Sequence, residues 1–351
     1  MDSQIRDIVA AGIRAPSGDN CQPWRFRIRG NSIDLFNVPE RDTSLYNYRQ
    51  RASLVAHGAC LENMVIAASA LGYAAEVELF PTPGDDRHVA SVALTPSAPA
   101  QEPLYGSIAE RTINRGAYGG GPLSATAAES LEQAARRIDG ARLTLLTGRD
   151  QMAVVADVVA LSDRLVFENE QLHGFLFDHI RWSAAQAEQT LDGLDLRTLE
   201  LAPADRLLFP FLRSFPLVRI LGGIGVTRII AANARKLMLS ASAAGMITIL
   251  DSSAPSWVAA GRQLERVWLE ATRQGLCFHP MTGITLLVQR CRDGADEELS
   301  EGNRSLVHKA DELLRGVGAS AAPVALLFRL GNGGEPSARS LRRDLDTYLG
   351  E

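Results

Sequence analysis

The stretch Pro16-Ser17-Gly18-Asp19-Asn20-Cys21-Gln22-Pro23-Trp24 is the most informative part of this chain. Its proline and glycine residues indicate a turn, and its short polar side chains can cap a helix or form hydrogen bonds. Gln22 adds both a donor and an acceptor. The run is too polar for a hydrophobic core, and its residue pattern is too specific for a linker. Two interpretations stay open: a capped turn ahead of a strand at 25–29, or a loop that grips a flat polar heterocycle.

The surroundings of this loop favour the second interpretation. A helical pattern over 5–14 precedes it and a strand follows it. The order of helix, Pro-Ser-Gly-x-Asn-x-Gln-Pro-Trp and strand resembles the entry segment of the nitroreductase family of flavin enzymes. In that family the loop lies against the FMN ring system, across a dimer interface. The resemblance implies flavin contacts for the following residues: Pro16, Ser17, Gly18, Asn20 and Gln22.

Bulk composition excludes several classes of function. The 351 residues are 46% hydrophobic and 22% charged, with a net charge of −5, which does not suit general nucleic-acid binding. Four cysteines and six histidines show no metal-ligand spacing, so we expect no metal, and we expect reduced thiols in a cytoplasmic protein. The N-terminal residues predict no signal peptide. Arginines interrupt the most apolar stretch, 209–234, so the sequence predicts no membrane span, although interfacial contact stays possible.

The pattern of elements repeats along the chain. A hairpin over 25–36, a helix over 53–71 and strands at 76–80 and 88–94 are expected in the first part. The second part predicts strands at 141–147, 246–250, 284–289 and 323–330, a helix over 259–274, and a largely helical stretch over 151–245. The two long helices share five identities at one constant offset, which pair Gly58, Leu61, Glu62, Ala68 and Gly72 with Gly261, Leu264, Glu265, Ala271 and Gly275.

This repetition predicts an α+β fold of two tandem halves. The resemblance implies that each half carries a central, mostly antiparallel sheet flanked by helices, and that the two form an intrachain pseudo-dimer. We expect the first nitroreductase-like half at 1–105 and the second at 106–351, with a helical, lid-like insertion over about 160–245. A fused pair supplies a whole flavin site in one chain, as a monomer or a weak homodimer. The alternative is that amphipathic helices merely look alike.

Two basic clusters could hold the dianionic phosphate of FMN, since arginine forks form strong charge-assisted bonds. One lies at 111–115 and the other at 339–343, after the last expected strand. Alone, each could equally be a solvated patch. In the resembled family an R-x-x-x-R segment and a closing basic segment both meet the phosphate. The resemblance therefore implies phosphate contacts for the following residues: Arg111, Asn114, Arg115, Arg339 and Arg342.

A turn at 275–283 completes the set of candidate segments. Pro280-Met281-Thr282-Gly283 matches the spacing of a Pro-x-Glu-Gly segment that faces the flavin near N5 in the resembled family, with threonine in place of glutamate. The resemblance implies backbone contacts for Thr282 and Gly283. His279 is either an acid or a loop histidine without a catalytic role, and no side chain is assigned as catalytic.

Each half lacks elements that the other has, which predicts one FMN per chain. Two functions stay open. The first is an FMN-dependent oxidoreductase that takes a hydride from NAD(P)H in ping-pong order and reduces a small molecule, with the flavin carrying the chemistry. The second is a flavin-storage or sequestering protein, because the length and the region 151–245 resemble a fused branch of the family that includes a storage protein. The sequence proposes a lid from Trp182, Leu191, Leu194, Leu196 and the prolines within 203–216.

Overall fold

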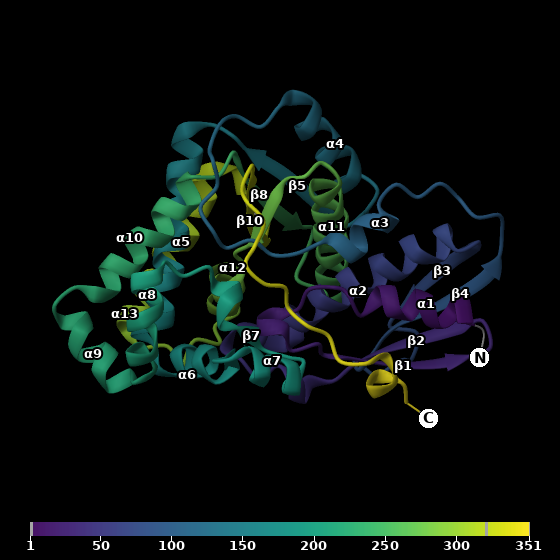
Figure 1. The fold of residues 1–351 in the computed structure, drawn as a ribbon, viewed down its shortest axis with the longest axis horizontal. Helices are drawn as coiled ribbons and strands as arrows, with labels where there is room; N and C mark the ends of the chain where they lie inside the picture. The colour runs from purple at the N-terminus through teal and green to yellow at the C-terminus, as the bar shows by residue number, and fades with distance from the viewer. Residues whose placement is uncertain (1–2, 320–321, 351) are drawn as a thin grey trace.

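The computed structural model describes residues 3–319 and 322–350 and contains two four-stranded antiparallel sheets (Figure 1). The first sheet has the order β1-β2-β4-β3 and comprises β1 (Trp24–Arg29), β2 (Ser32–Asn37), β3 (Tyr73–Leu79) and β4 (His88–Pro96). The second has the order β5-β8-β10-β9 and comprises β5 (Ala141–Leu146), β8 (Ala243–Ile249), β9 (Cys277–Pro280) and β10 (Val324–Gly331). The strands of the first sheet fall within residues 24–96, and those of the second sheet fall within residues 141–331.

Both sheets follow the same path. Taken in chain order within each half, the strands are arranged first, second, fourth, third, and every neighbouring pair is antiparallel. A 20-residue helix joins the second strand to the third in each case, α2 (Arg51–Ala70) in the first half and α11 (Ala254–Arg273) in the second. The α+β fold with one antiparallel sheet in each half is therefore confirmed.

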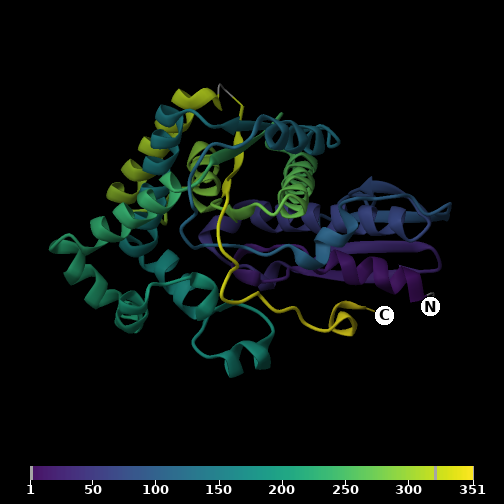
Figure 2. The same cartoon turned by 45° about the horizontal axis from the view of Figure 1, so that its top comes forward.

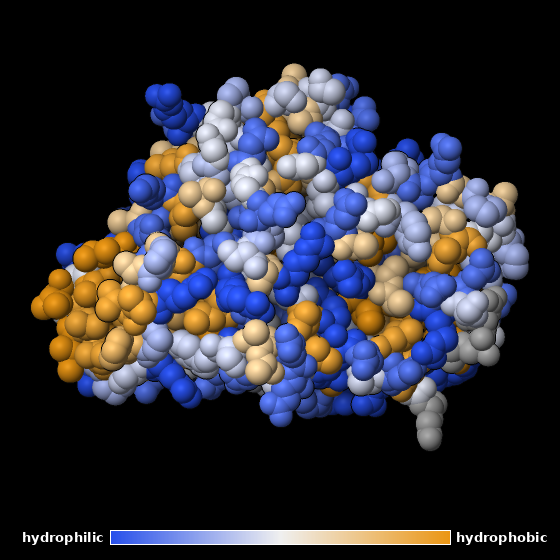
Figure 3. Space-filling view, viewed as in Figure 1, coloured by the Kyte–Doolittle hydropathy of each residue, from blue (hydrophilic) through white to orange (hydrophobic). Residues whose placement is uncertain are grey.

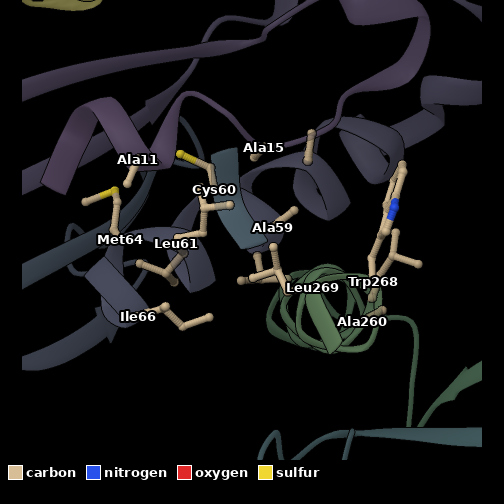
Figure 4. Close-up of a cluster of buried hydrophobic side chains, with 14 of the residues drawn as sticks. Ala11, Ala15, Ala59, Cys60, Leu61, Met64, Ile66, Ala260, Trp268 and Leu269 are labelled. Carbon is tan, nitrogen blue, oxygen red and sulfur yellow. The ribbon is translucent and has the colours of Figure 1, made fainter. Parts of the chain in front are cut away.

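Helices α2 and α11 cross in backbone contact at the repeated glycines. A Cβ atom on Gly58 would lie 2.1 Å from the carbonyl oxygen of Val258, and one on Gly261 would lie 2.0 Å from that of Val55. Each glycine thus faces the residue three positions before the other, so the contact is two-fold symmetric. Figure 4 shows this packing, with α11 end-on beside Ala59, Cys60 and Leu61 of α2. No other residue type fits at these positions without separating the helices.

An ion-pair cluster fixes the same crossing. Glu62 of α2 is fully buried and accepts hydrogen bonds from Arg262 and Arg266 of α11, at 2.8 and 2.7 Å. Donor and acceptor are both charged in each of these hydrogen bonds, so the bonds favour one specific arrangement of the two helices. The structure therefore joins the halves through a core helix pair rather than through a mobile linker.

Helix α2 also meets a length and composition test for a membrane span. With the turn before it, Leu45–Ala70 is long and apolar enough to cross a bilayer, and 83% of its most apolar window is buried inside the protein. Burial of this kind is typical of a core helix. Within residues 3–319 and 322–350, two further helices, α9 (Phe215–Gly223) and α10 (Val226–Leu239), are long and apolar enough for a span only when they are taken together. The chain bends by 89° between them.

Helix α1 (Ser3–Gly12) lies beside the first sheet and α2, whereas most of the remaining helices gather around the second sheet (Figure 1). Figures 1 and 2 place α9 and α10 far from the first sheet, at the opposite end of the molecule. The other helices are α3 (Tyr105–Glu110), α4 (Ala125–Ala135), α5 (Arg149–Glu168), α6 (Glu170–His179), α7 (Ala184–Thr190), α8 (Pro203–Leu208), α12 (Gly283–Arg292) and α13 (Glu301–Leu314). A short parallel pair, β6 (Ile180–Arg181) with β7 (Leu194–Asp195), lies among them.

The C-terminal segment returns to the first half. After β10 the chain runs back across the molecule as an extended segment (Figure 2). Leu349 forms a parallel bridge with Phe26 of β1, and the amide of Gly350 donates to the Phe26 carbonyl at 2.8 Å. The basic residues around 340 are thereby carried to the N-terminal loop.

One expected strand is wrong. The run 284–289 lies in helix α12 (Gly283–Arg292), and the third strand of this sheet is β9 (Cys277–Pro280), which the sequence had suggested as a turn. Residues 284–290 are all buried, so no polar face reveals the helical period. A short apolar run of this kind does not distinguish a strand from a buried helix.

Candidate functional site

A cavity of about 1050 Å³ brings together segments that are far apart in the sequence. It lies between the N-terminal loop, the segment 111–115, the turn 279–283 and the C-terminal segment, with helices of the middle region closing one end. Ten of the predicted site residues line it, namely Pro16, Ser17, Gly18, Asn20, Arg111, Arg115, Thr282, Gly283, Arg339 and Arg342. Gln22 and Asn114 are not among the lining residues.

Gln22 lies behind the loop and holds its shape. Asp19, Asn20 and Gln22 have positive φ angles of 43°, 59° and 54°, which few residues other than glycine and asparagine adopt. The fully buried Gln22 amide donates to the carbonyls of Asn20 and Leu191, at 3.1 and 2.8 Å, and its oxygen accepts from the Tyr348 hydroxyl. In this structure Gln22 therefore supports the loop from behind rather than lining the cavity.

Asn114 is likewise used within the protein. Its side-chain amide donates to the Gly334 carbonyl at 2.7 Å, and its oxygen accepts from the amide of Gly116 at 3.0 Å. These bonds tie the segment 111–115 to the loop after β10. Gln22 and Asn114 share one feature: each polar side chain is hydrogen-bonded to groups of the protein itself, which a motif cannot distinguish from a ligand contact.

Arg342 joins the C-terminal segment to the N-terminal loop. Its guanidinium donates to the carbonyls of Ile13 and Ala15, at 3.0 and 2.8 Å, and to Asn20 Oδ1 at 2.7 Å. Burial, and next the nearby positive charge of Arg111, together lower the pKa of Arg342 to about 9. The positive charges of Arg111 and Arg342 repel each other unless an anion binds beside them.

Arg111 is buried against α11. Its Nε atom lies 3.0 Å from Glu265 Oε1, it donates to the Arg14 carbonyl at 2.5 Å, and its guanidinium stacks 4.4 Å from the centre of the Trp268 ring. Burial lowers the pKa of Arg111, while Glu265 opposes this effect. Burial also raises the pKa of Glu265. Arg111 therefore has a structural partner as well as a place on the cavity wall.

Two exposed arginines complete a cationic end of the cavity. Arg14 and Arg339 both donate to the carbonyl of Ala109, at 3.1 and 3.2 Å, and both line the cavity. With Arg111 and Arg342 they place four guanidinium groups on the cavity wall, and of these Arg111 is paired with the buried carboxylate of Glu265. This arrangement suits an anion with more than one charge. Arg14 was not predicted as a site residue, because it stands outside any R-x-x-x-R spacing.

Arg329 forms another cationic part of the wall, and it too was not predicted. It lies on β10, is fully buried and donates to the carbonyls of Leu237, Arg115 and Gly116, at 2.7, 2.9 and 2.7 Å. It also donates to Nδ1 of His279 at 3.3 Å. An arginine inside the otherwise apolar strand Val324–Gly331 was the signal that could have revealed it.

His279 lines the cavity in its neutral form. Burial, and next the positive charge of Arg329, hold its pKa well below the usual value. Because Nδ1 accepts from Arg329, the imidazole is not poised to act as a cationic acid. The structure thus favours the interpretation that His279 has no catalytic role, and it places this histidine in strand β9 rather than in a loop.

The middle region forms the apolar end of the cavity. Phe167, Phe175, Leu199, Phe209 and Leu212 line it from α5, α6 and the segments that follow. Of the expected lid residues, Leu194 lies on the wall, whereas Trp182 packs against Phe177 and Phe209 outside the lining. The cavity therefore has one cationic and one apolar end.

Several proteins of Mycobacterium tuberculosis are similar to this chain in sequence. A 344-residue match to an uncharacterized Mycobacterium tuberculosis protein, MT1398, is 30% identical and covers 96% of this chain and 47% of that protein. A second, MT3217 of the same organism, is named "Putative NAD(P)H nitroreductase" and is 33% identical over 44% of this chain and 46% of that protein. The chain thus spans about half the length of these first relatives. The M. tuberculosis protein named "Putative NAD(P)H nitroreductase acg" is 27% identical over 81% of each chain.

The chain is similar to nitroreductase-like proteins. No family model matches it. Among solved structures, the FMN-dependent nitroreductase NfnB of Mycobacterium smegmatis, in complex with NADPH, is 12% identical with a TM-score of 0.40, covering 70% of this chain and 96% of that chain. A nitroreductase with bound FMN from Desulfitobacterium hafniense is 13% identical with a TM-score of 0.38, covering 70% and 97%.

Two titratable residues on the cavity wall were missed by sequence reasoning. Tyr46 lies against Gly283, where a Cβ atom would come within 2.9 Å of its ring. Asp163 of α5 faces the cavity, and burial raises its pKa to about 7. Asp163 follows Val155 and Val159 at four-residue spacing and precedes Phe167, so it occupies an apolar position of the helix. An acidic residue at an apolar position of a helix was the signal that could have revealed Asp163.

We expect the Asp163→Asn substitution to stabilise the protein more at pH 8 than at pH 5. The folded-state pKa of about 7 lies above the unfolded value, so the folded protein holds an extra proton and loses stability as the pH rises toward 7. Removing this charge should raise the free energy of unfolding at pH 8 by about 1–3 kcal/mol. Urea unfolding at both pH values measures the difference. Asp150→Asn, at an exposed position of the same helix, is the control. Equal effects of Asp163→Asn at both pH values would contradict the assignment.

Proposed function

We propose that the chain is an FMN-dependent oxidoreductase that binds one FMN and takes a hydride from NAD(P)H. The observation that carries this proposal is the convergence of four segments on one cavity. These segments, 16–20, 111–115, 279–283 and 339–342, were selected from the sequence by their resemblance to one flavin-binding family. Two of the relatives bear the name of NAD(P)H nitroreductases, which supports the donor.

The residues of the cavity fit FMN. Arg14, Arg339 and Arg342 would hold the phosphate, with Arg111 behind them. The loop 17–20 and the backbone of Thr282-Gly283 would hold the ring system. FMN supplies hydride acceptance and release when bound, in ping-pong order. The protein's part is to orient the ring and exclude water, and no side chain is assigned as an acid or base.

We further propose that the halves, 1–105 and 106–351, arose by duplication, and that the region 160–245 is an insertion in the second. The recurrent strand order and the reciprocal contact of Gly58 and Gly261 support this proposal. One FMN per chain follows, because the ring loop comes from one half and the arginines at 111, 339 and 342 come from the other. A single chain would thus suffice as the functional unit, in the cytoplasm, with a small-molecule substrate.

A second candidate function is flavin storage, as in the fused branch of the family. The helices that close the apolar end of the cavity favour it, since they could cover a bound ring. In this alternative the protein would sequester FMN and react slowly with nicotinamide.

Anaerobic reduction of the FMN-loaded protein separates the two candidates. We expect NADPH to bleach the visible flavin absorbance within seconds in a stopped-flow instrument, because the cavity of about 1050 Å³ extends from the cationic end into a further, apolar end. Dithionite is the control that shows the flavin is reducible. Reduction by dithionite but not by NADPH or NADH would contradict the enzyme and favour storage.

A further inference from the structure

Large apolar side chains are exposed together on one segment of the molecule. Among the residues that the structure describes, six of the nine exposed large hydrophobic side chains belong to 207–229, with exposed fractions of 76% for Leu207, 63% for Leu208, 65% for Phe211, 69% for Ile220, 78% for Ile224 and 70% for Ile229. Figure 3 shows the resulting apolar patch at the end of the molecule where Figure 1 places α8, α9 and α10. We call it the 207–229 patch.

The patch is not required for the packing of these helices. Val218 of α9 and Ala231 of α10 are buried on the inner face, and the Thr227 hydroxyl donates to Glu168 of α5 at 2.9 Å. The outer face, with Ile220, Ile224 and Ile229, contacts solvent. Soluble monomers rarely expose contiguous apolar surface of this kind without a binding role.

Positive charge accompanies the apolar surface. The segment 203–230 contains four arginines and one acidic residue, Asp205, in a chain with a net charge of −5. Arg213, Arg219 and Arg228 are exposed, and none of them forms an ion pair with a described residue. Unpaired arginines beside exposed isoleucines and leucines are typical of a surface that meets anionic lipid.

We propose that the 207–229 patch docks this protein onto the surface of an anionic lipid bilayer. Helices α9 and α10 have nine and 14 residues and meet at 89°, so neither is long enough to cross a bilayer, and both suit the interface plane. A second copy of the chain is the less favourable occupant, because a two-fold contact would bring unpaired arginines of both copies together. Lipid phosphates instead complement them.

Docking would have a consequence for the cavity. Leu208, Phe211 and Ile229 are exposed in the patch and also line the apolar end of the cavity. The docked protein would therefore turn that end toward the bilayer. The proposal does not depend on the flavin, so it holds for flavin-free and flavin-loaded protein alike.

Vesicle flotation tests the proposal. We expect the wild type to float with vesicles of phosphatidylcholine mixed with phosphatidylglycerol, and to bind vesicles of phosphatidylcholine alone at least about tenfold more weakly. The double variants Ile220→Ser with Ile224→Ser, and Arg219→Glu with Arg228→Glu, should each lose at least about tenfold in affinity for the anionic vesicles. Matched controls outside the patch are Leu250→Ser, at a side chain that is 81% exposed, and Arg137→Glu with Arg149→Glu. The controls should bind like the wild type.

Three results would overturn the proposal. The first is a wild type that fails to float with anionic vesicles, and the second is an equal loss in the control variants. The third is a wild-type dimer in analytical ultracentrifugation that the patch variants disperse, without vesicle binding, since the face would then join two copies of the chain. Circular dichroism and thermal unfolding establish that each variant is folded before its binding is compared.

Discussion

Replacing Gly261 by alanine is expected to lower the free energy of unfolding by about 3 kcal/mol or more. The added Cβ would lie 2.0 Å from the carbonyl oxygen of Val55, which belongs to a helix backbone and cannot rotate away. The helices α2 and α11 would have to separate, and their separation would disturb the core that joins the two halves. Gly58→Ala should cost a similar amount, because its Cβ would lie 2.1 Å from the Val258 carbonyl oxygen.

Denaturant unfolding with a matched control measures this effect. In Gly174→Ala, on helix α6, the new Cβ would meet no atom within 4 Å, so that variant should be neutral or slightly more stable. The double variant Gly58→Ala with Gly261→Ala should cost clearly less than the sum of the single variants, since one separation accommodates both methyl groups. Single variants as stable as Gly174→Ala would disprove the close crossing of the halves.

Arg339→Gln and Arg14→Gln are each expected to weaken FMN binding by roughly 10- to 100-fold, as losing one charge-assisted contact costs about 1.5–3 kcal/mol. Both side chains line the cationic end and donate only to the Ala109 carbonyl among the hydrogen bonds found for them in the described part of the chain. They are therefore available to a phosphate, and their loss should leave the fold intact. Fluorescence titration with FMN gives the affinities.

Riboflavin distinguishes a phosphate contact from a general defect. It lacks the phosphate, so the wild type and both variants should bind it about equally, and the exposed Arg137→Gln variant should bind FMN normally. A parallel loss of riboflavin affinity would move the two arginines from the phosphate to some other role. Arg111 is a poorer test, because Arg111→Ala would leave the buried carboxylate of Glu265 without its partner and destabilise the fold.

Much of the framework could be predicted from the sequence, because its signals are local. The strands around 76–80, 88–94 and 141–147 alternate in hydrophobicity, and the paired helices show their shared glycines. The strands around 246–250 and 323–330 are buried on both faces, and they were recognised as short apolar runs instead. The α12 segment was missed because it is buried on all sides. The functions of Gln22 and Asn114 depend on which groups the fold brings near them, namely Tyr348, Leu191 and Gly334.

The cavity could be predicted only in part. The motif at 16–24 and the two basic clusters pointed to the lining residues, because glycine turns and arginine spacings are visible in a sequence. Arg14, Arg329 and Asp163 were missed, since each becomes notable only when the element around it is known to be buried or adjacent to the cavity. The exposed face of α9 and α10 was likewise invisible, as an apolar run does not reveal which side faces solvent.

The most direct test of the account is calorimetric titration of the flavin-free protein with FMN and, separately, with riboflavin. One FMN should bind per chain, with an affinity at least about tenfold greater than that for riboflavin because of the cationic end of the cavity. Two FMN per chain would contradict the single composite site. No FMN binding, or equal affinities for the two flavins, would contradict the proposed function itself.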